Sequence, residues 1–345
     1  MSPGPTSRLL CSSKGEYLRN AGSGMNLRIL RLTSALILSS IAPLAAGCAG
    51  TRRADLHQTL RQNERPNPEG EPRILAAYQP WFGRPGHINV GYSSQDRAVL
   101  VQQVTEAENL GISGFVVNWY GASHPFEDHA YSLLQDVAAA NDFSVSIMYD
   151  ENADDPAHTT EDTINDLNYA NERYISAGQG AKAYLRYNGR PVIFVFPKGG
   201  HTDWARVREA VKAWSEPPLL LYKDIDAATA SNFDGFYAWV HPGRGGWAAD
   251  GSNWGQSYLE HFYSEMTARY PDKLAVGAAW PGFDDRRASW GRNRRMNTRC
   301  GKTFADSLRL FRRYYNDQHP LPFLLIVTWN DYEEGTAIER GLGKC

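Results

Sequence analysis

The sequence predicts a single-domain (β/α)8 barrel over residues 71–345, in which eight parallel strands alternate with helices. Short apolar runs rich in β-branched residues alternate with segments of helical periodicity, and this alternation is typical of a parallel sheet. Eight such runs in roughly 270 residues fit a closed barrel. An open, doubly wound sheet is the alternative, but no Gly-x-Gly-x-x-Gly fingerprint follows the first run.

The individual elements follow from apolar periodicity and from turn residues. The predicted strands span residues 74–82, 112–120, 144–150, 192–196, 219–222, 235–240, 274–279 and 323–328. The predicted helices span residues 94–110, 126–140, 160–176, 204–214, 256–269 and 304–315. Ser94 is the expected N-cap of the first helix and Gly111 its C-terminal stop. Asn188-Gly189 predicts a hairpin turn before the fourth strand.

Residues 1–48 are predicted to be a leader and a signal peptide. Met25 offers a second start, and it is followed by basic residues and an apolar stretch over 32–46. This stretch is shorter than a typical membrane span. The small residues before Cys48 resemble a bacterial lipobox, although Ala45 stands where that pattern prefers an aliphatic residue. The chain is therefore expected to be exported and anchored in the cell envelope through a lipid on Cys48.

Residues 49–70 are polar and proline-rich, which predicts a disordered tether. Export into an oxidising compartment makes a disulfide possible between Cys300 and Cys345, the two cysteines outside the processed segment. The sequence leaves open whether this pair is bridged. No Cys-x-x-Cys motif or cysteine–histidine cluster indicates a zinc site, so no metal is expected.

The charge and aromatic content narrow the class of partner. The chain has 36 basic and 38 acidic residues and a net charge of −2. This balance argues against binding to nucleic acid or to an anionic membrane surface. The 10 tryptophans and 18 tyrosines suit contacts with sugar rings, although many will simply fill the core.

Candidate sugar-contacting residues lie at the C-terminal ends of the predicted strands, where the active site of a β/α barrel is found. They are Tyr78, Trp81, His87 and Tyr92 after the first strand; Trp119 and Tyr120 after the second; Asp150 and Glu151 after the third; Trp239 and His241 after the sixth; Trp280 and Asp284 after the seventh; and Trp329, Asn330 and Glu333 after the eighth. Lys198 and His201 follow the fourth strand, and Lys223 and Asp224 follow the fifth. The loops at the opposite ends of the strands show no such concentration, which predicts a sugar-processing cleft.

Structural roles remain open for several of these residues. His87 and His241 could be hydrogen-bonded structural histidines. Asp284 could belong to a solvated charge pair with a following arginine. Trp119 and Tyr120 could be core residues.

The segment 328–339 carries the strongest chemical signal. Asp331, Glu333 and Glu334 follow a buried strand within a few residues. Because like charges at close range repel and raise each other's pKa, folding gains nothing from this cluster. Cleavage of a glycosidic bond needs two carboxyl groups, one to protonate the leaving oxygen and one to act as base or nucleophile. A polar loop that caps a barrel strand is the alternative.

The run from Trp329 to Thr336, Trp-Asn-Asp-Tyr-Glu-Glu-Gly-Thr, resembles the closing motif of glycoside hydrolase family 99, the endo-α-mannosidases and endo-α-mannanases. The segment 280–287 resembles the seventh strand end of that family, and 78–83 and 117–121 resemble the first and second. The α-1,3-glucanases of family 71 have similar features, including a Trp-Asn-Asp-Tyr run. The resemblance spans about residues 74–340 and implies an α-glycosidase that needs no metal or organic cofactor.

The resemblance also implies roles for two carboxyl groups. In family 99 the first carboxylate deprotonates the sugar 2-hydroxyl to give an anhydro-sugar, and the second serves as general acid and then base. These positions fall on Asp331 and Glu334, which predicts retention of configuration. Family 99 has glutamate at the position of Asp331, so the shorter side chain leaves room for a direct nucleophile or an inverting pair.

The predicted function is therefore hydrolysis of α-mannosidic or α-glucosidic linkages in oligo- or polysaccharides by a monomer. A non-catalytic glycan-binding lipoprotein on the same barrel is the alternative from another class, and the departure at Asp331 favours it. An α-1,3-glucanase-like enzyme is a further alternative that differs only in substrate.

Overall fold

The computed structural model describes residues 72–151, 155, 157–198, 201–241, 252–316 and 321–342. The predicted leader and tether, together with Cys48 and Cys345, lie outside these residues. None of the described helices combines the length and the apolar character needed to cross a bilayer.

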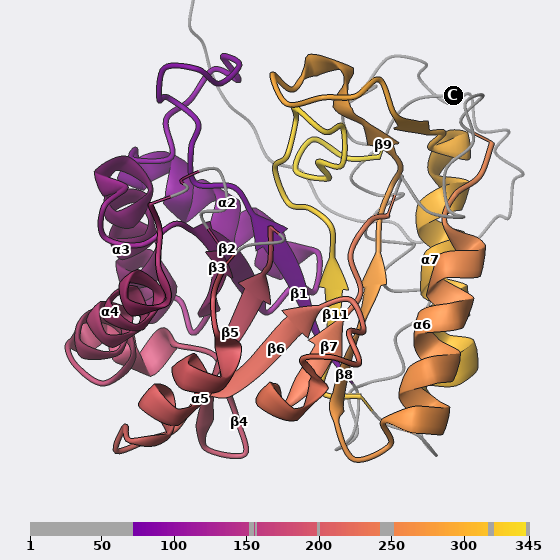
Figure 1. Cartoon of the computed structure of the whole chain (residues 1–345). Coiled ribbons are helices and arrows are strands. Elements are labelled where there is room, and N and C mark those ends of the chain that lie inside the picture. The colour runs from indigo at the N-terminus through magenta and orange to yellow at the C-terminus, as the bar shows by residue number, and fades with distance from the viewer. Residues whose placement is uncertain are drawn as a thin grey trace, which may run out of the picture. The chain divides into compact units, whose positions relative to one another are not determined.

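Eight parallel strands close into a barrel, as the sequence predicts (Figure 1). In chain order they are β1 (Arg73–Tyr78), β2 (Gly114–Trp119), β3 (Ser144–Asp150), β5 (Arg190–Phe196), β6 (Leu219–Lys223), β7 (Gly235–Tyr237), β8 (Leu274–Ala279) and β11 (Phe323–Ile326). Pairing of β1 with β11 joins the first strand to the last, and pairing of β3 with β5 completes the circle. Close approach of strands restricts some positions: a Cβ atom at Gly235 would lie 2.1 Å from the Leu274 carbonyl oxygen.

The two-residue strand β4 (Arg186–Tyr187) pairs antiparallel with β5. Asn188 and Gly189 connect them with φ angles of 49° and 78°. Two consecutive positive φ angles define the tight turn that Asn-Gly favours. The predicted hairpin is therefore confirmed.

Helices pack around the barrel between successive strands. They are α2 (Arg97–Asn109), α3 (Pro125–Ala140), α4 (Thr160–Ala170), α5 (Trp204–Lys212), α6 (Gln256–Arg269) and α7 (Lys302–Tyr314). Figure 1 shows α2, α3 and α4 on one flank and α6 and α7 on the other. Between β6 and β7 only a short 3-10 turn, Ala230–Asn232, stands in place of a helix.

The start of the first helix and the end of the third depart furthest from prediction. Ser94 does not cap α2, because it is fully buried and its backbone N–H donates to the Phe82 carbonyl at 2.7 Å. Asp96 is the cap, and its carboxylate accepts from the Ala98 N–H at 2.9 Å. The helix expected over 160–176 is α-helical only to Ala170 and continues as a π turn, Asn171–Ile175.

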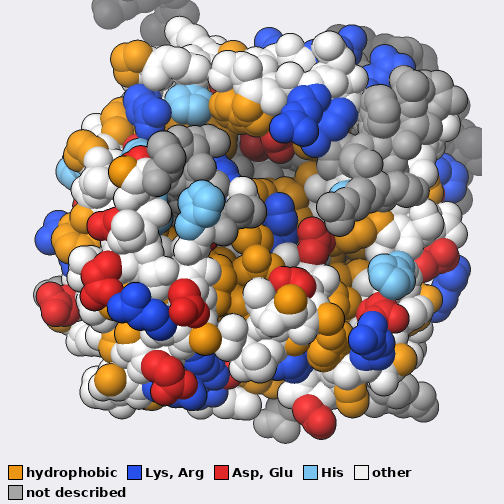
Figure 2. Space-filling view, viewed as in Figure 1, with side chains coloured by type: hydrophobic (Ala, Val, Ile, Leu, Met, Phe, Trp, Pro, Cys, Tyr) orange, Lys and Arg blue, Asp and Glu red, His pale blue; other side chains and the backbone are white. Residues whose placement is uncertain are grey.

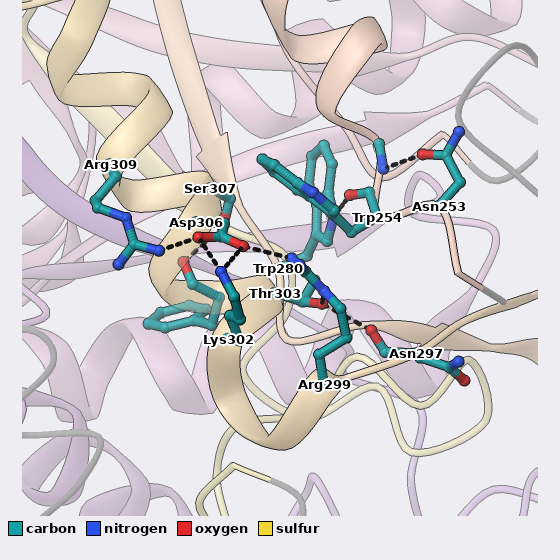
Figure 3. Close-up of polar contacts among 12 residues, drawn as sticks. Asn253, Trp254, Trp280, Asn297, Arg299, Lys302, Thr303, Asp306, Ser307 and Arg309 are labelled. Atoms are coloured by element: carbon teal, nitrogen blue, oxygen red, sulfur yellow. Dashed lines mark hydrogen bonds and ion pairs between the residues drawn. The ribbon is translucent and has the colours of Figure 1, made fainter.

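The start of α7 is tied to the preceding loop through one carboxylate (Figure 3). Asp306 accepts from Arg299 at 2.7 Å and from Lys302 at 3.1 Å, and it also pairs with Arg309. Burial alone would raise the pKa of Asp306, but these cationic donors outweigh it and lower the pKa. Cys300 in this loop is disulfide-bonded. Its pairing with Cys345 stays a prediction because Cys345 lies outside the described residues.

Candidate active site

The chain after β11 forms a tight turn built on one aspartate. The Asp331 Oδ1 atom accepts from the backbone N–H groups of Glu333 at 3.0 Å and Glu334 at 2.8 Å. The Asp331 N–H in turn donates to the Thr328 hydroxyl at 2.8 Å. Aspartate and threonine favour such turns because their short side chains reach nearby backbone groups. In Figure 1 the strand arrows point upward, and this yellow segment lies at that end, beside the hairpin that contains β9 (Phe283–Asp284).

The two glutamates of this turn have different hydrogen-bond partners. Glu333 is buried and accepts from the Ile88 N–H at 3.1 Å, and it contacts His87 Nδ1 at 2.8 Å. It therefore braces the loop after β1. The Glu334 Oε1 atom accepts instead from the Trp290 indole N–H at 3.0 Å. The three acidic side chains of this segment therefore have different partners: Glu333 contacts the loop after β1, Glu334 contacts Trp290, and Asp331 holds the turn itself.

Asp331 and Glu334 both have raised pKa values. Burial is the main cause of the raised pKa of Asp331, and the negative charge of Glu334 adds to it. Burial also raises the pKa of Glu334, although donation from Trp290 and the charge of Arg294 oppose the rise. A carboxyl group with a raised pKa can retain a proton near neutral pH and can act as a general acid.

Two lysines and a further acid lie at the ends of other barrel strands or directly after them. Asp150 at the end of β3 is buried and pairs with Lys198 at 2.9 Å between Oδ1 and Nζ. Lys223 at the end of β6 lies 3.8 Å over the ring of Phe196. Burial lowers the pKa of Lys223, and nearby acids including Glu334 oppose this shift. The two lysines were not among the predicted contacts, yet their place at strand ends was a usable signal.

A pocket of about 370 Å³ reaches Trp290, the indole that donates to Glu334, although neither Glu334 nor Asp331 is among its lining residues. It is lined by Trp81, Arg84, Pro85, Gly86, His87, Tyr120, His124, Glu127, Lys198, Ser289 and Trp290. Trp81, His87 and Tyr120 were predicted as contacts and do line it. Trp290 was missed, because it lies in a long loop after β8 that carries no local signal. The face of the molecule drawn in Figure 2 has a hollow with acidic and basic side chains among hydrophobic ones.

The imidazole of His87 is held inside this pocket. Its ring stacks on Trp81 at 4.9 Å between centroids and 12° between planes. Its contact with Glu333 fixes the other side. His87 is thus both a structural residue and part of the pocket wall.

Three of the predicted contacts are fully buried and do not line the pocket. The Tyr78 hydroxyl donates to Gln103 on α2 at 2.8 Å. The Trp119 indole donates to Asp128 on α3 at 3.0 Å. Trp329 is fully buried, with its ring 5.4 Å from that of Phe115. Successive side chains of a strand alternate in direction, so a residue at a strand end can face the helices instead of the barrel mouth.

The predicted aromatic residues after β7 and β8 also lie outside the pocket lining. Trp239 packs edge-on against Phe196 at 5.3 Å, and His241 stacks on Tyr258 at 5.1 Å. Trp280 is fully buried, and its indole donates to the Trp254 carbonyl at 2.9 Å (Figure 3).

The remaining predicted contacts make structural hydrogen bonds. Asp284 pairs with Arg286 at 2.5 Å, which lowers the pKa of Asp284 as in the charge-pair alternative. The Glu151 carboxylate accepts from the Lys198 N–H at 3.2 Å. The Tyr92 hydroxyl donates to Glu339 at 3.0 Å.

Asn330 joins the end of β11 to the end of β1. Its Oδ1 accepts from the Gln79 N–H at 2.7 Å, and its Nδ2 donates to the Gln79 carbonyl at 2.9 Å. The side chain is fully buried, and these two hydrogen bonds clamp the ends of the first and last strands together.

Asn330→Ala is expected to lower the free energy of unfolding by about 3 kcal/mol, because it leaves both backbone groups of Gln79 buried without partners. Urea unfolding of the variant measures this. Asn89→Ala is the control, because Asn89 is exposed and accepts only the Gly91 N–H; a change within about 0.5 kcal/mol is expected there. Equal stability of the two variants would contradict the clamp role of Asn330.

No cluster of three metal-ligating side chains occurs in the part of the chain that the structure describes. A closed (β/α)8 barrel with buried carboxyl groups and an aromatic pocket at the C-terminal ends of its strands is compatible with a glycoside hydrolase.

The chain belongs to glycosyl hydrolase family 71, whose family model matches residues 88–339. It is thus a glycoside hydrolase. A search of curated proteins found no match.

Solved structures share the fold. A GH99 endo-α-mannosidase from Bacteroides thetaiotaomicron has a TM-score of 0.61 and 18% identity, over 77% of this chain and 87% of that chain. The same kind of enzyme in complex with bis-tris-propane gives a TM-score of 0.61 and 19% identity, over 77% and 86%. A glycoside hydrolase-like protein gives 0.57 and 11%, over 82% and 91%. Both resemblances noted in the sequence therefore recur, family 71 in the family model and family 99 in the fold.

Proposed function

We propose that this enzyme cleaves α-glucosidic or α-mannosidic linkages in oligo- or polysaccharides, with Glu334 and Asp331 as its catalytic carboxyl groups. The observation that carries the proposal is the environment of this pair. Both groups lie just past β11, burial raises both pKa values, and Trp290 links Glu334 to the pocket. Membership of family 71 makes α-1,3-glucan the first substrate to test.

Glu334 is the proposed general acid. It accepts one hydrogen bond, from Trp290, and among the described residues its Oε2 has no hydrogen-bond partner. That oxygen is therefore left to hold the proton that passes to the leaving glycosidic oxygen.

Asp331 is the proposed base. Two backbone N–H groups donate to its Oδ1, and they partly oppose the rise in the pKa of Asp331 that burial causes. Its Oδ2 accepts no hydrogen bond from any residue that the structure describes. This oxygen is available to take a proton from a water molecule.

We further propose inversion of configuration. The retention implied by family 99 depends on a glutamate at the position of Asp331. Asp331 is one methylene shorter, and its own turn holds it back through Oδ1. Both features favour space for a water molecule between the carboxylate and the anomeric carbon, as inverting enzymes require.

The activity is tested by incubation with α-1,3-, α-1,4- and α-1,6-glucans and with α-mannans, followed by analysis of the released sugars. Shorter oligosaccharides are expected from at least one of them, with α-1,3-glucan first. Binding without turnover on every polymer and on activated aryl α-glycosides would overturn the proposal in favour of a non-catalytic glycan-binding protein.

The stereochemistry is tested by proton NMR of the first product released from a defined α-glycoside. Initial appearance of the β-anomer is expected. If the α-anomer appears first, the reaction proceeds with retention, and Asp331 is a nucleophile or the base of an anhydro-sugar route.

We propose that the mature chain begins at Cys48 and carries a lipid there. The basic and apolar segments before the small residues of the lipobox-like sequence support this. Mass spectrometry of the mature N-terminus in the native host is expected to find a diacylglyceryl-modified cysteine. An unmodified N-terminus at another position would remove the anchor.

A further inference from the structure

We propose that the pocket walled by Trp81, His87 and Trp290 is a subsite for a neutral sugar unit next to the one being cleaved. Trp290 supplies its stacking face and is also the positioning residue of Glu334. This inference rests on the proposed function, because it places the pocket relative to Glu334.

Trp290 joins the pocket to the acid through two different parts of one side chain. Its indole N–H donates to Glu334 Oε1 at 3.0 Å. Its ring meets Trp81 at 5.9 Å and His87 at 6.0 Å, both edge-on. These contacts leave the side chain 42% exposed, which is unusual among the large apolar residues of this chain. A flat, exposed indole in a pocket suits the C–H face of a sugar ring.

The loop that carries Trp290 is braced before substrate arrives. Strand β9 pairs with β10 (Arg295–Met296) at its base. Asp285 within the loop is fully buried and accepts from the Arg292 N–H at 3.0 Å and from Arg294 Nε at 2.7 Å. A loop already held in place costs little to order on binding. The position of Trp290 is therefore preformed.

The charges around the pocket indicate a neutral occupant. Arg84 pairs with Glu127. His87 contacts Glu333 at 2.8 Å, and the ammonium group of Lys198 pairs with Asp150 at 2.9 Å. A carboxylated or sulfated sugar would have to compete with these pairs for its counter-charge, whereas hydroxyl groups can add hydrogen bonds without breaking them.

The link to Glu334 gives a signature that simple packing would not produce. Burial raises the pKa of Glu334, and donation from Trp290 opposes the rise. A phenylalanine at position 290 keeps a ring but loses the N–H donor, so the pKa of Glu334 should rise further. A general acid loses its proton, and with it its function, as pH rises through its pKa. Because the pKa of Glu334 is higher in this variant, the alkaline limb of the pH–rate profile should move to higher pH.

The test compares Trp290→Phe and Trp290→Ala on two substrates: an α-linked oligosaccharide of four units from the best polymer, and the matching glycosyl fluoride. The fluoride has one sugar and does not reach the neighbouring subsite, and its leaving group needs little proton donation. Trp290→Ala is expected to lower kcat/KM on the oligosaccharide by about tenfold or more and to affect the fluoride much less. Trp290→Phe is expected to have a KM close to that of the wild type. The alkaline limb of its pH–rate profile is expected to move to higher pH.

Trp214→Phe is the matched control, because its indole donates to Asn168, between the barrel's helices. This variant is expected to keep the wild-type kcat/KM on both substrates. Equal losses of Trp290→Ala on both substrates would overturn the subsite, and an unshifted pH profile for Trp290→Phe would overturn the positioning role.

A binding measurement separates this inference from the proposed function. Calorimetry compares the affinity of a four-unit oligosaccharide with non-hydrolysable thioglycosidic linkages for Glu334→Gln with that for Glu334→Gln/Trp290→Ala. About tenfold weaker binding by the double variant is expected even if Glu334 proves not to be the acid. Equal affinities would refute the subsite, whereas full activity of Glu334→Gln would refute only the role of Glu334.

Discussion

Replacement of Glu334 by glutamine is expected to lower turnover by a factor of about 10²–10⁴ on substrates with poor leaving groups. Glutamine keeps the shape of the side chain and can still accept from Trp290, but it cannot donate an acidic proton. Steady-state kinetics on an oligosaccharide and on the matching glycosyl fluoride measure the effect, and the fluoride should lose far less.

Stability should hold or rise in this variant. Burial raises the pKa of Glu334 in the folded protein, so its ionisation opposes folding at neutral pH, and an uncharged amide removes that cost. The melting temperature at pH 7 checks this point, and a lowered value would indicate that the lost activity reflects damage to the fold.

Glu333→Gln is the matched comparison, since it makes the same change one residue away. Its carboxylate braces His87 and Ile88, so this variant should lose stability and much less turnover than Glu334→Gln. If Glu333→Gln abolishes turnover while Glu334→Gln stays near normal, the register carried over from family 99 is off by one.

Asp331→Asn is expected to reduce turnover at least about 10²-fold, on activated and natural substrates alike. An asparagine oxygen can still accept the two backbone N–H groups of the turn, so the fold should survive. The amide cannot take a proton from water, which removes the base. Unlike Glu334→Gln, Asp331→Asn should lose as much turnover on substrates with good leaving groups as on substrates with poor ones.

Asp96→Asn is the control for this change. Asp96 also accepts a backbone N–H through its carboxylate, at the start of α2, but it has no part in the site. Turnover should be unchanged. If Asp331→Asn keeps more than about a tenth of the wild-type turnover, the base is another group, and Asp150 is then the first to examine.

The barrel was predictable because its signal is local and repeated. Strand β3, helix α6 and strand β8 have the bounds that the apolar pattern predicts. The Asn188-Gly189 turn follows from residues that tolerate positive φ angles. The concentration of acids and aromatics at one end of the strands likewise pointed to the end that carries the site.

The surface against which each individual side chain packs could not be predicted in the same way. Tyr78 ends the first strand and Trp81 follows it, yet Tyr78 contacts α2 and Trp81 lines the pocket. Periodicity indicates that a residue is buried, but not which surface buries it. A one-residue change of register sends a strand side chain to the other face.

The sequence by itself indicated the barrel, the resemblance to families 99 and 71, and the segment that carries the proposed acid pair. Only the tertiary structure shows that Glu333 contacts His87, 246 residues away. It also shows that the indole of Trp290 donates a hydrogen bond to Glu334, 44 residues away. The three acidic residues of the segment are alike in chemistry and nearly alike in position. Their roles are set by partners from distant parts of the chain, and such contacts exist only once the barrel has closed.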